Sequence, residues 1–256
     1  MRLQLLSDLH LETETFDPTP APDAEALVLA GDIDATWAGF ERFAHWPVPV
    51  WLVAGNHEFD GREWNDAWPA LRAHTRSLGL TLLEQESMEL QDRAGRLLRF
   101  VATTRWADFD LYGAAQRERA MRSAGYFLRL MRATRDGRVF DAAAMRAAAL
   151  ECRAWLKTEL ARPHRCDATI VITHFAPSAA SADPRFGQQP STASFCNDDQ
   201  ALLAQADLWL HGHLHCQHDY RVAHGGARDT RVVCNARGVA AKREGRGFDP
   251  LCVVEV

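Results

Sequence analysis

The sequence predicts an α/β fold in which two β-sheets pack face to face and are flanked by helices. Short continuous apolar runs, a clear amphipathic helix and two hairpins predict it. The runs cover residues 3–6, 26–32, 48–57, 168–174 and 207–213. Each run ends in a polar residue or glycine, which is typical of strands that are buried on both faces.

The helix is predicted over residues 141–161, where apolar side chains recur at helical spacing from Met145 to Leu160. Asp141 can cap its start, and Pro163 follows its end. One hairpin is predicted over residues 88–101, with its turn at 92–95, and another over residues 218–235, with its turn at Gly225-Gly226. Buried strands and hairpins together indicate two sheets rather than one.

The chain of 256 residues, 47% of them hydrophobic, can bury the core of one large α/β domain. There is no internal repeat and no linker rich in Gly, Pro or Ser, so we expect one domain over residues 1–256. With 29 basic against 34 acidic residues the net charge is -5, which makes a nucleic-acid partner unlikely.

The six cysteines lie far apart and form no Cys-x-x-Cys pair. They are expected to be reduced thiols. The first residues carry no apolar run long enough for a signal peptide, and no stretch approaches the length of a membrane span. We therefore expect a cytoplasmic protein with no membrane partner. The sequence leaves the oligomeric state open.

Polar residues cluster where the predicted strands end. Asp8 and His10 follow the first run, Asp32 the second, Asn56 and His57 the third, His174 the fourth, and His213 and His215 the fifth. Ligand sites in α/β sheets form beyond the carboxyl ends of the strands. One histidine at a strand end is usually structural, but five converging strand ends indicate a metal site.

The spacing and chemistry of these residues favour two neighbouring cations. Residues two apart on an extended chain, such as Asp8 and His10 or His213 and His215, project to the same side. Mixed carboxylate and imidazole donors suit Mn, Fe, Zn or Co better than calcium or magnesium. Two such ions lie about 3.5–4 Å apart in sites that cleave phosphoesters. Gly31, Gly55 and Gly212 would allow close backbone approach.

The blocks Asp-x-His, Gly-Asp, Gly-Asn-His-Glu, His and Gly-His-x-His occur in this order between Asp8 and His215. In this order they resemble the calcineurin-like metallophosphoesterase superfamily over nearly the whole chain. The resemblance implies a four-layer αββα sandwich with two mixed β-sheets flanked by helices. It also implies a hydrolase with two divalent transition-type metal ions, manganese among the candidates.

Carried over by position, the resemblance implies one metal ion bound by Asp8, His10, Asp32 and His215. It implies a second bound by Asp32, Asn56, His174 and His213, with Asp32 as the bridge. The implied nucleophile is a hydroxide that bridges the metal ions. His57 matches the family's histidine that binds no metal and stabilises or protonates the leaving oxygen.

The neighbours of these blocks are assigned less specific roles. His211 is expected to support the site rather than bind metal, and Asp34 is expected at the surface. Arg105, Arg185 and Arg237 are candidate phosphate contacts in a chain that is rich in arginine. The aromatic residues of segment 104–113 either cover the core or form a wall for a substrate ring. Segment 177–199, directly behind His174, is expected to act as a lid.

The expected function is hydrolysis of a phosphodiester with a small or nucleotide-like substrate. A phosphomonoesterase acting on small molecules or phosphoproteins is the alternative, because the blocks define the chemistry and not the leaving group. A nuclease is disfavoured by the acidic net charge. A non-catalytic scaffold with the same fold is disfavoured because every implied ligand and His57 are present.

Overall fold

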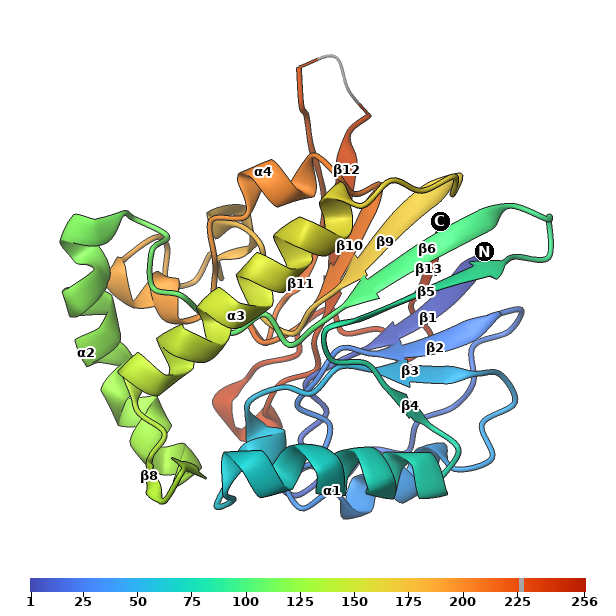
Figure 1. Ribbon diagram of the computed structural model, residues 1–256. Helices are drawn as coiled ribbons and strands as arrows, with labels where there is room; N and C mark the ends of the chain where they lie inside the picture. Colours follow the sequence, from blue (N-terminus) through green and yellow to red (C-terminus); the bar gives the residue numbers. More distant parts are fainter. Residues whose placement is uncertain (226–227) are drawn as a thin grey trace.

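The computed structural model describes residues 1–225 and 228–256, and two stacked mixed sheets form its centre (Figure 1). The first sheet has the order β13-β1-β2-β3-β4. Its strands are β1 (Arg2–Leu6), β2 (Ala26–Leu29), β3 (Val50–Leu52), β4 (Thr81–Leu82) and β13 (Val253–Glu255). β1 to β4 are parallel, and β13 pairs with β1 in the antiparallel sense.

The second sheet has the order β11-β12-β10-β9-β6-β5. Its strands are β5 (Glu86–Gln91), β6 (Leu97–Ala102), β9 (Ala168–Ile172), β10 (Leu208–His211), β11 (Gln217–Val222) and β12 (Thr230–Asn235). The four central strands are parallel, and the edge strands β5 and β11 are antiparallel to their neighbours. A small third sheet pairs β7 (Thr134–Arg135) with β8 (Arg138–Val139).

Helices α1 (Trp64–Ser77), α3 (Ala142–Ala161) and α4 (Gln200–Leu203) cover the outer faces of the two large sheets. The helix α2 (Ala114–Met131) lies beyond the strand ends and packs on α3 and on the segment around residues 190–194. Short 3-10 turns are η1 (Ala38–Phe43), η2 (His57–Phe59), η3 (Ala179–Ser181), η4 (Pro190–Ser194) and η5 (Ala240–Lys242). In Figure 1, α1 lies below the first sheet and α3 crosses the outer side of the second. The four layers are those of an αββα sandwich.

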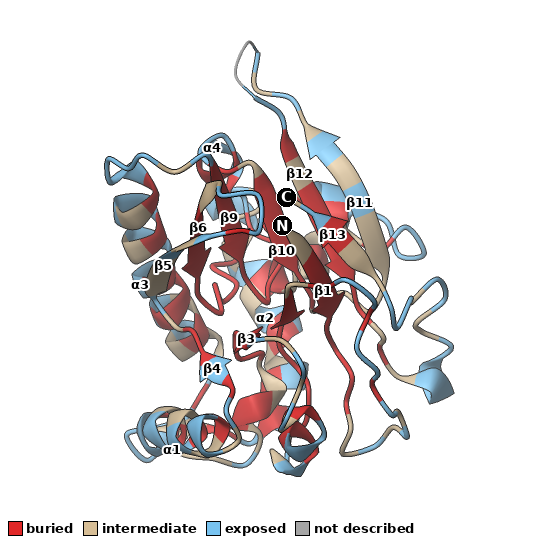
Figure 2. Ribbon diagram, turned by 90° about the vertical axis from the view of Figure 1, so that its right-hand side faces the viewer, coloured by how far each residue is buried: buried red, intermediate tan, exposed pale blue. Residues whose placement is uncertain are grey.

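Alternate residues along the strands enter different parts of the core. Leu5 and Val28 of the first sheet pack with Ile170 and Leu210 of the second in one cluster between the sheets. Leu29, one residue along, belongs to the cluster beneath α1. Both faces of the central strands are therefore buried, as the continuous apolar runs predicted. The buried residues, red in Figure 2, accordingly gather along these strands.

The predicted elements are confirmed where the structure describes them. Asp141 caps α3 through hydrogen bonds from the backbone N–H groups of Ala143 and Ala144. β5–β6 and β11–β12 are antiparallel pairs, although Gly226 of the second predicted turn lies outside the described residues. β1 ends with its apolar run at Leu6, whereas β2, β3, β9 and β10 end before their runs do, and the last residues of those four runs turn toward the site. No helix in the described parts of the chain is both long and apolar enough to cross a membrane.

Candidate metal centre

The seven predicted ligands meet at the carboxyl ends of five parallel strands from both sheets. They follow β1, β2, β3, β9 and β10. The donor atoms form two groups, and within each group all of them lie within 4.8 Å of one another. One group is Asp8, His10, Asp32 and His215, and the other is Asp32, His174 and His213. Asp32 belongs to both groups, as the bridging position requires.

In the first group the imidazole rings of His10 and His215 face each other, and His215 also faces the carboxylate of Asp8. Nε2 of His10 lies 3.0 Å from Nε2 of His215. The same His215 nitrogen lies 3.4 Å from Oδ1 of Asp8. Asp8 also accepts hydrogen bonds from the backbone N–H of His213 and from the hydroxyl of Ser7. These bonds fix the orientation of its carboxylate.

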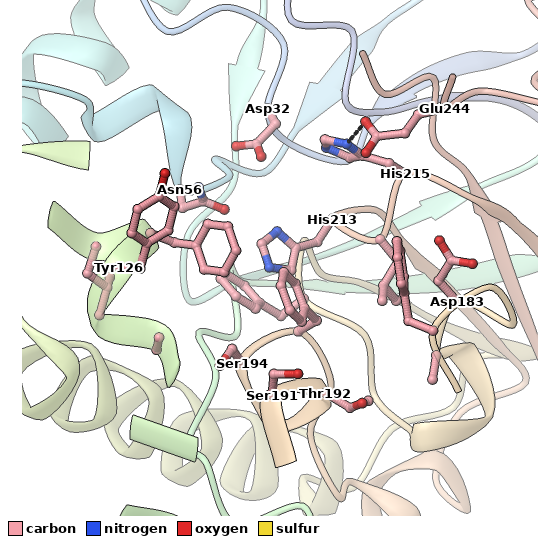
Figure 3. Close-up of a pocket in the computed structure, with 18 of the residues that line it drawn as sticks. Asp32, Asn56, Tyr126, Asp183, Ser191, Thr192, Ser194, His213, His215 and Glu244 are labelled. Atoms are coloured by element: carbon pink, nitrogen blue, oxygen red, sulfur yellow. Dashed lines mark hydrogen bonds and ion pairs between the residues drawn. The ribbon is translucent and has the colours of Figure 1, made fainter. Parts of the chain in front are cut away.

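In the second group, Nε2 of His174 lies 3.2 Å from Oδ2 of Asp32 and 3.1 Å from Nδ1 of His213. Asn56 contributes an amide oxygen, Oδ1, which is buried and has no hydrogen-bond partner among the described residues. Figure 3 shows Asp32, Asn56 and His213 around the same part of the pocket. A buried acceptor without a donor is costly, and a cation would satisfy it.

The remaining ring nitrogens of three histidines are held by oxygen acceptors. Nδ1 of His174 lies 2.7 Å from the carbonyl of Ala30. Nδ1 of His215 lies 2.6 Å from Glu244, and Nδ1 of His10 lies 3.2 Å from Glu12. Donation from Nδ1 leaves the Nε2 lone pair of each ring free to bind a cation, and such partners are typical of metal-binding histidines. The residues therefore fit two metal ions.

The backbone at the site differs from the extended chain that the two-residue spacing suggested. Five of the predicted ligands have left-handed backbone angles, with φ of 54° at Asp8, 47° at His10, 53° at Asp32, 73° at His213 and 50° at His215. Tight turns, rather than strand alternation, bring their side chains together. Non-glycine residues rarely adopt this conformation, and such strain gathers at functional sites.

Two glycines allow the turns to pass close to the ligands. A Cβ atom at Gly55 would collide with the carboxylate of Asp32, and one at Gly212 would collide with Asp8 and Ser7. The prediction of close backbone approach at these glycines is confirmed.

Glu58 ties two of the ligand turns together, and the sequence reasoning assigned it no role. Its buried carboxylate accepts backbone N–H bonds from Gly55 at 2.6 Å, Ile33 at 2.7 Å and Asp32 at 3.0 Å. It thereby joins the turn after β2 to the turn after β3. Its place in the Gly-Asn-His-Glu block was the available signal. Glu12 and Glu244 were also missed, and Glu244 comes from a segment with no sequence pattern.

The charges of the cluster shift the pKa values of its members strongly. Burial would raise the pKa of Asp8, but the hydrogen bond from His215 and the charge of His174 outweigh it and lower the pKa to about 2. Burial would lower the pKa of His174, but Asp32 raises it to about 9. The same two carboxylates lower the free energy of a positive charge at this position, whether a proton or a metal ion supplies it.

His57 lies beside Asn56 but points its Nδ1 at a different partner, Oδ2 of Asp60, at 2.7 Å. Burial would lower the pKa of His57, but the charges of Asp32 and Asp60 outweigh it and raise the pKa to about 9. Nε2 is left free, and the side chain lines the same cavity as Asp32. His57 therefore has one nitrogen fixed by Asp60 and one that faces no partner among the described residues.

The structure decides several of the secondary assignments. His211 is fully buried and its Nε2 lies 2.9 Å from the hydroxyl of Ser181, outside both donor groups, so its supporting role is confirmed. The prediction that Asp34 lies at the surface is wrong. Its buried carboxylate accepts the backbone N–H groups of Thr36 and Gly39 and shapes the turn after Asp32.

The arginines differ from one another. Arg105 is fully buried and binds Asp199 through two nitrogens at 2.8 and 2.9 Å, so the idea that it contacts phosphate is wrong. Arg237 binds Glu14 at 3.3 Å and is absent from the cavity lining. Arg185 does line the cavity, but Asp183 holds it at 2.8 Å.

Segments 104–113 and 177–199 have different relations to the site. Trp106 and Phe109 are buried in the core, so the reading in which the aromatic residues of the first segment cover the core is confirmed. The second segment lines the cavity from Ala182 to Phe195. It contains η3 and η4 and is fixed at its end by the ion pair between Asp199 and Arg105.

A calcineurin-like phosphoesterase family model matches residues 1–217, and the chain belongs to this family. The match covers all the blocks that carry the site. No curated protein sequence matches the chain.

Among solved structures, the phosphopantetheinyl hydrolase from Mycobacterium tuberculosis is similar with a TM-score of 0.71 and 18% sequence identity, over 94% of this chain and 90% of that one. A dimetal phosphatase from Danio rerio matches with a TM-score of 0.44 and 12% identity, over 90% and 86% of the two chains. The first similarity supports the fold. Family and site together define a metal-dependent phosphoesterase with a dinuclear site.

Proposed function

We propose that the protein is a phosphodiesterase that acts on a small phosphodiester, with two transition-type metal ions. In this proposal Asp8, His10, Asp32 and His215 bind one ion, and Asp32, Asn56, His174 and His213 bind the other. The grouping of donor atoms and the unpartnered amide oxygen of Asn56 support it. Imidazole and oxygen donors favour Mn, Fe, Zn or Co. When bound, two such ions would neutralise phosphate charge and lower the pKa of water, so that hydroxide is available as the nucleophile near neutral pH.

His57 is proposed to donate a proton to the leaving oxygen. Its Nδ1 is held by Asp60, which leaves Nε2 to face the leaving oxygen, and the charge of Asp60 favours a protonated ring. A proton delivered to the leaving oxygen as the P–O bond breaks prevents the build-up of negative charge on that oxygen. Asp60 positions the ring and stabilises its protonated form.

The charge balance of the cavity carries the preference for a diester. The charged lining residues other than the candidate ligands and His57 are Asp183, Arg185, Lys242 and Glu244, and their formal charges cancel. Two divalent ions with the two carboxylates of Asp8 and Asp32 would leave a local charge of about +2. A diester carries one negative charge and a monoester up to two. The attacking hydroxide would use one of the two positive charges, and the lining offers no further net positive charge for the second charge of a monoester.

The test compares bis-p-nitrophenyl phosphate with p-nitrophenyl phosphate after loading with Mn²⁺. We expect a higher kcat/KM for the diester, and complete loss of activity after chelation that returns when metal is added. Faster turnover of the monoester would contradict the diesterase proposal and favour a phosphomonoesterase. Full activity in verified metal-free protein would contradict the metal mechanism.

A panel of natural phosphoesters then identifies the substrate. It includes nucleotide diesters and a phosphopantetheinyl ester, because the similar structure from Mycobacterium tuberculosis is that of a phosphopantetheinyl hydrolase.

A further inference from the structure

The candidate metal centre opens into one cavity of about 710 Å³, which is large enough for a drug-sized organic group in addition to a phosphoryl group. Asp32, Asn56 and His57 lie at one end. The cavity continues between α2 and the substrate-side segment, which we define as residues 182–195. In Figure 3, Tyr126 of α2 lies on one side of the pocket, and Ser191 and Ser194 of the substrate-side segment lie below His213.

The wall that α2 forms is apolar and exposed. Tyr126, Phe127 and Leu130 are 59%, 53% and 58% exposed, although they are large hydrophobic residues. The buried stripe of the helix, which includes Ala124 and Leu128, also lines the cavity and is apolar as well. Among the described residues, four of the seven exposed large hydrophobic side chains line this cavity, and Phe186 is the fourth. An exposed apolar patch of this kind marks a binding surface.

A chain of aromatic contacts connects this wall to the candidate metal centre. The ring of Phe195 lies 5.2 Å from the ring of His213. Phe127 lies 6.0 Å from Phe195, and Tyr126 lies 5.4 Å from Phe127, measured between ring centroids. The apolar surface therefore begins at a candidate ligand and runs outward without a gap. An organic group attached to a phosphate at the centre would lie along it.

We propose that this wall is a subsite for a long aliphatic chain on the phosphoester, with Phe127, Leu130 and Phe195 as its main contacts. This inference rests on the proposed function and specifies its substrate class. The surface that α2 presents consists mainly of aromatic and aliphatic carbon, and it favours an alkyl group over a polar one because each buried methylene lowers the free energy of binding. The continuity of the cavity with the metal centre identifies the occupant as part of the substrate.

The test uses methyl p-nitrophenyl phosphate and octyl p-nitrophenyl phosphate, kept below the concentration at which the octyl ester forms micelles. Both release p-nitrophenol, so a difference in kcat/KM reports the alkyl chain. A fully buried methylene contributes about fourfold in affinity, and we expect the octyl ester to be favoured at least about tenfold. In the double variant Phe127→Ala/Leu130→Ala the ratio of octyl to methyl kcat/KM should fall severalfold.

The matched control is Val139→Ala, which removes an apolar side chain that is 62% exposed on β8 and outside the cavity lining. It should leave the ratio unchanged. Thermal unfolding of each variant checks that the fold is retained. If both esters react equally fast in the parent protein, or if the control lowers the ratio as much as the double variant does, the subsite proposal is wrong.

Calorimetry with octyl methylphosphonate and ethyl methylphosphonate gives a second readout that needs no turnover. The octyl compound should bind at least about tenfold more tightly, and the double variant should lose most of this difference. If neither nitrophenyl diester is hydrolysed, the diesterase proposal fails while the calorimetry still decides the subsite. Equal affinities for the two phosphonates would overturn the subsite, whatever the activity measurements show.

Discussion

Nδ1 of His57, the first residue of η2, lies 2.7 Å from Oδ2 of Asp60, the residue that directly follows this turn. Burial would lower the pKa of His57, but the charge of Asp32 and the hydrogen bond and charge of Asp60 raise it to about 9. A histidine whose pKa is raised on folding stabilises the fold fully below its ordinary pKa of 6.5. This stabilisation is lost as the pH rises through about 9.

The first prediction concerns this titration in the metal-free protein. NMR of the His57 ring should give a pKa of about 9, and Asp60→Asn should lower it because one of the carboxylates that hold the proton is gone. Zn²⁺ should also lower it, since a cation at Asp32 cancels the second charge. An unchanged His57 pKa in Asp60→Asn would contradict the proposed role of Asp60.

Replacement of His57 should separate chemistry from metal binding. His57→Ala should retain its metal content and lose about 10²–10⁴-fold in rate on an alkyl or nucleoside ester, whose leaving oxygen needs a proton. The loss with p-nitrophenol as leaving group should be much smaller. Metal analysis and the two rates are measured side by side, with His164→Ala as the control. Equal losses on both substrates would make His57 a charge stabiliser rather than a proton donor.

The shared position of Asp32 predicts a difference between two carboxylate variants. Asp32 belongs to both donor groups and Asp8 to one. Asp32→Ala should weaken binding of both ions, whereas Asp8→Ala should mainly weaken one. Titration with metal, followed by measurement of bound metal per chain, distinguishes the two. Retention of two tightly bound ions by Asp32→Ala would refute the bridging position.

Glu244 should tune metal affinity without binding metal itself. It accepts a hydrogen bond from His215 at 2.6 Å and so fixes the tautomer that leaves Nε2 free. Glu244→Gln should lower metal affinity about 10–100-fold, as for other partners of metal-binding histidines. Glu118→Gln, on the exposed part of α2, is the control and should change nothing. The affinities come from competition with a coloured chelator.

The sequence predicted the sheets and the set of converging residues because both depend on local patterns. A continuous apolar run predicts a buried strand, and parallel strands bring their carboxyl ends to one edge whatever lies between them. The residues that follow the runs, such as Asp32 and His174, were therefore placed together correctly. The conformation of the local backbone was not predicted correctly, because the left-handed turns at Asp8 and His213 follow no simple periodicity.

The remaining features depend on contacts that are distant in the chain. Glu244 meets His215 across 29 residues, and Arg105 meets Asp199 across 94. An arginine that binds phosphate and one that is buried in an ion pair look alike in a sequence. The apolar wall of α2 was missed for a similar reason. Tyr126 and Phe127 resemble core residues until the tertiary structure leaves their side of the helix uncovered.

The buried ion pair of Arg105 and Asp199 affects which residues behind His174 can vary without moving the candidate metal ligands. The chain leaves the centre at His174, and its return is fastened by this pair and by Asn197, whose amide oxygen accepts the backbone N–H of Asp108. Both fastenings lie outside the cavity lining. Residues 182–194 can therefore vary in length and sequence more freely than Phe195, whose ring contacts the candidate ligand His213. Phe195 is then the residue at which the segment that shapes substrate choice meets the candidate metal centre.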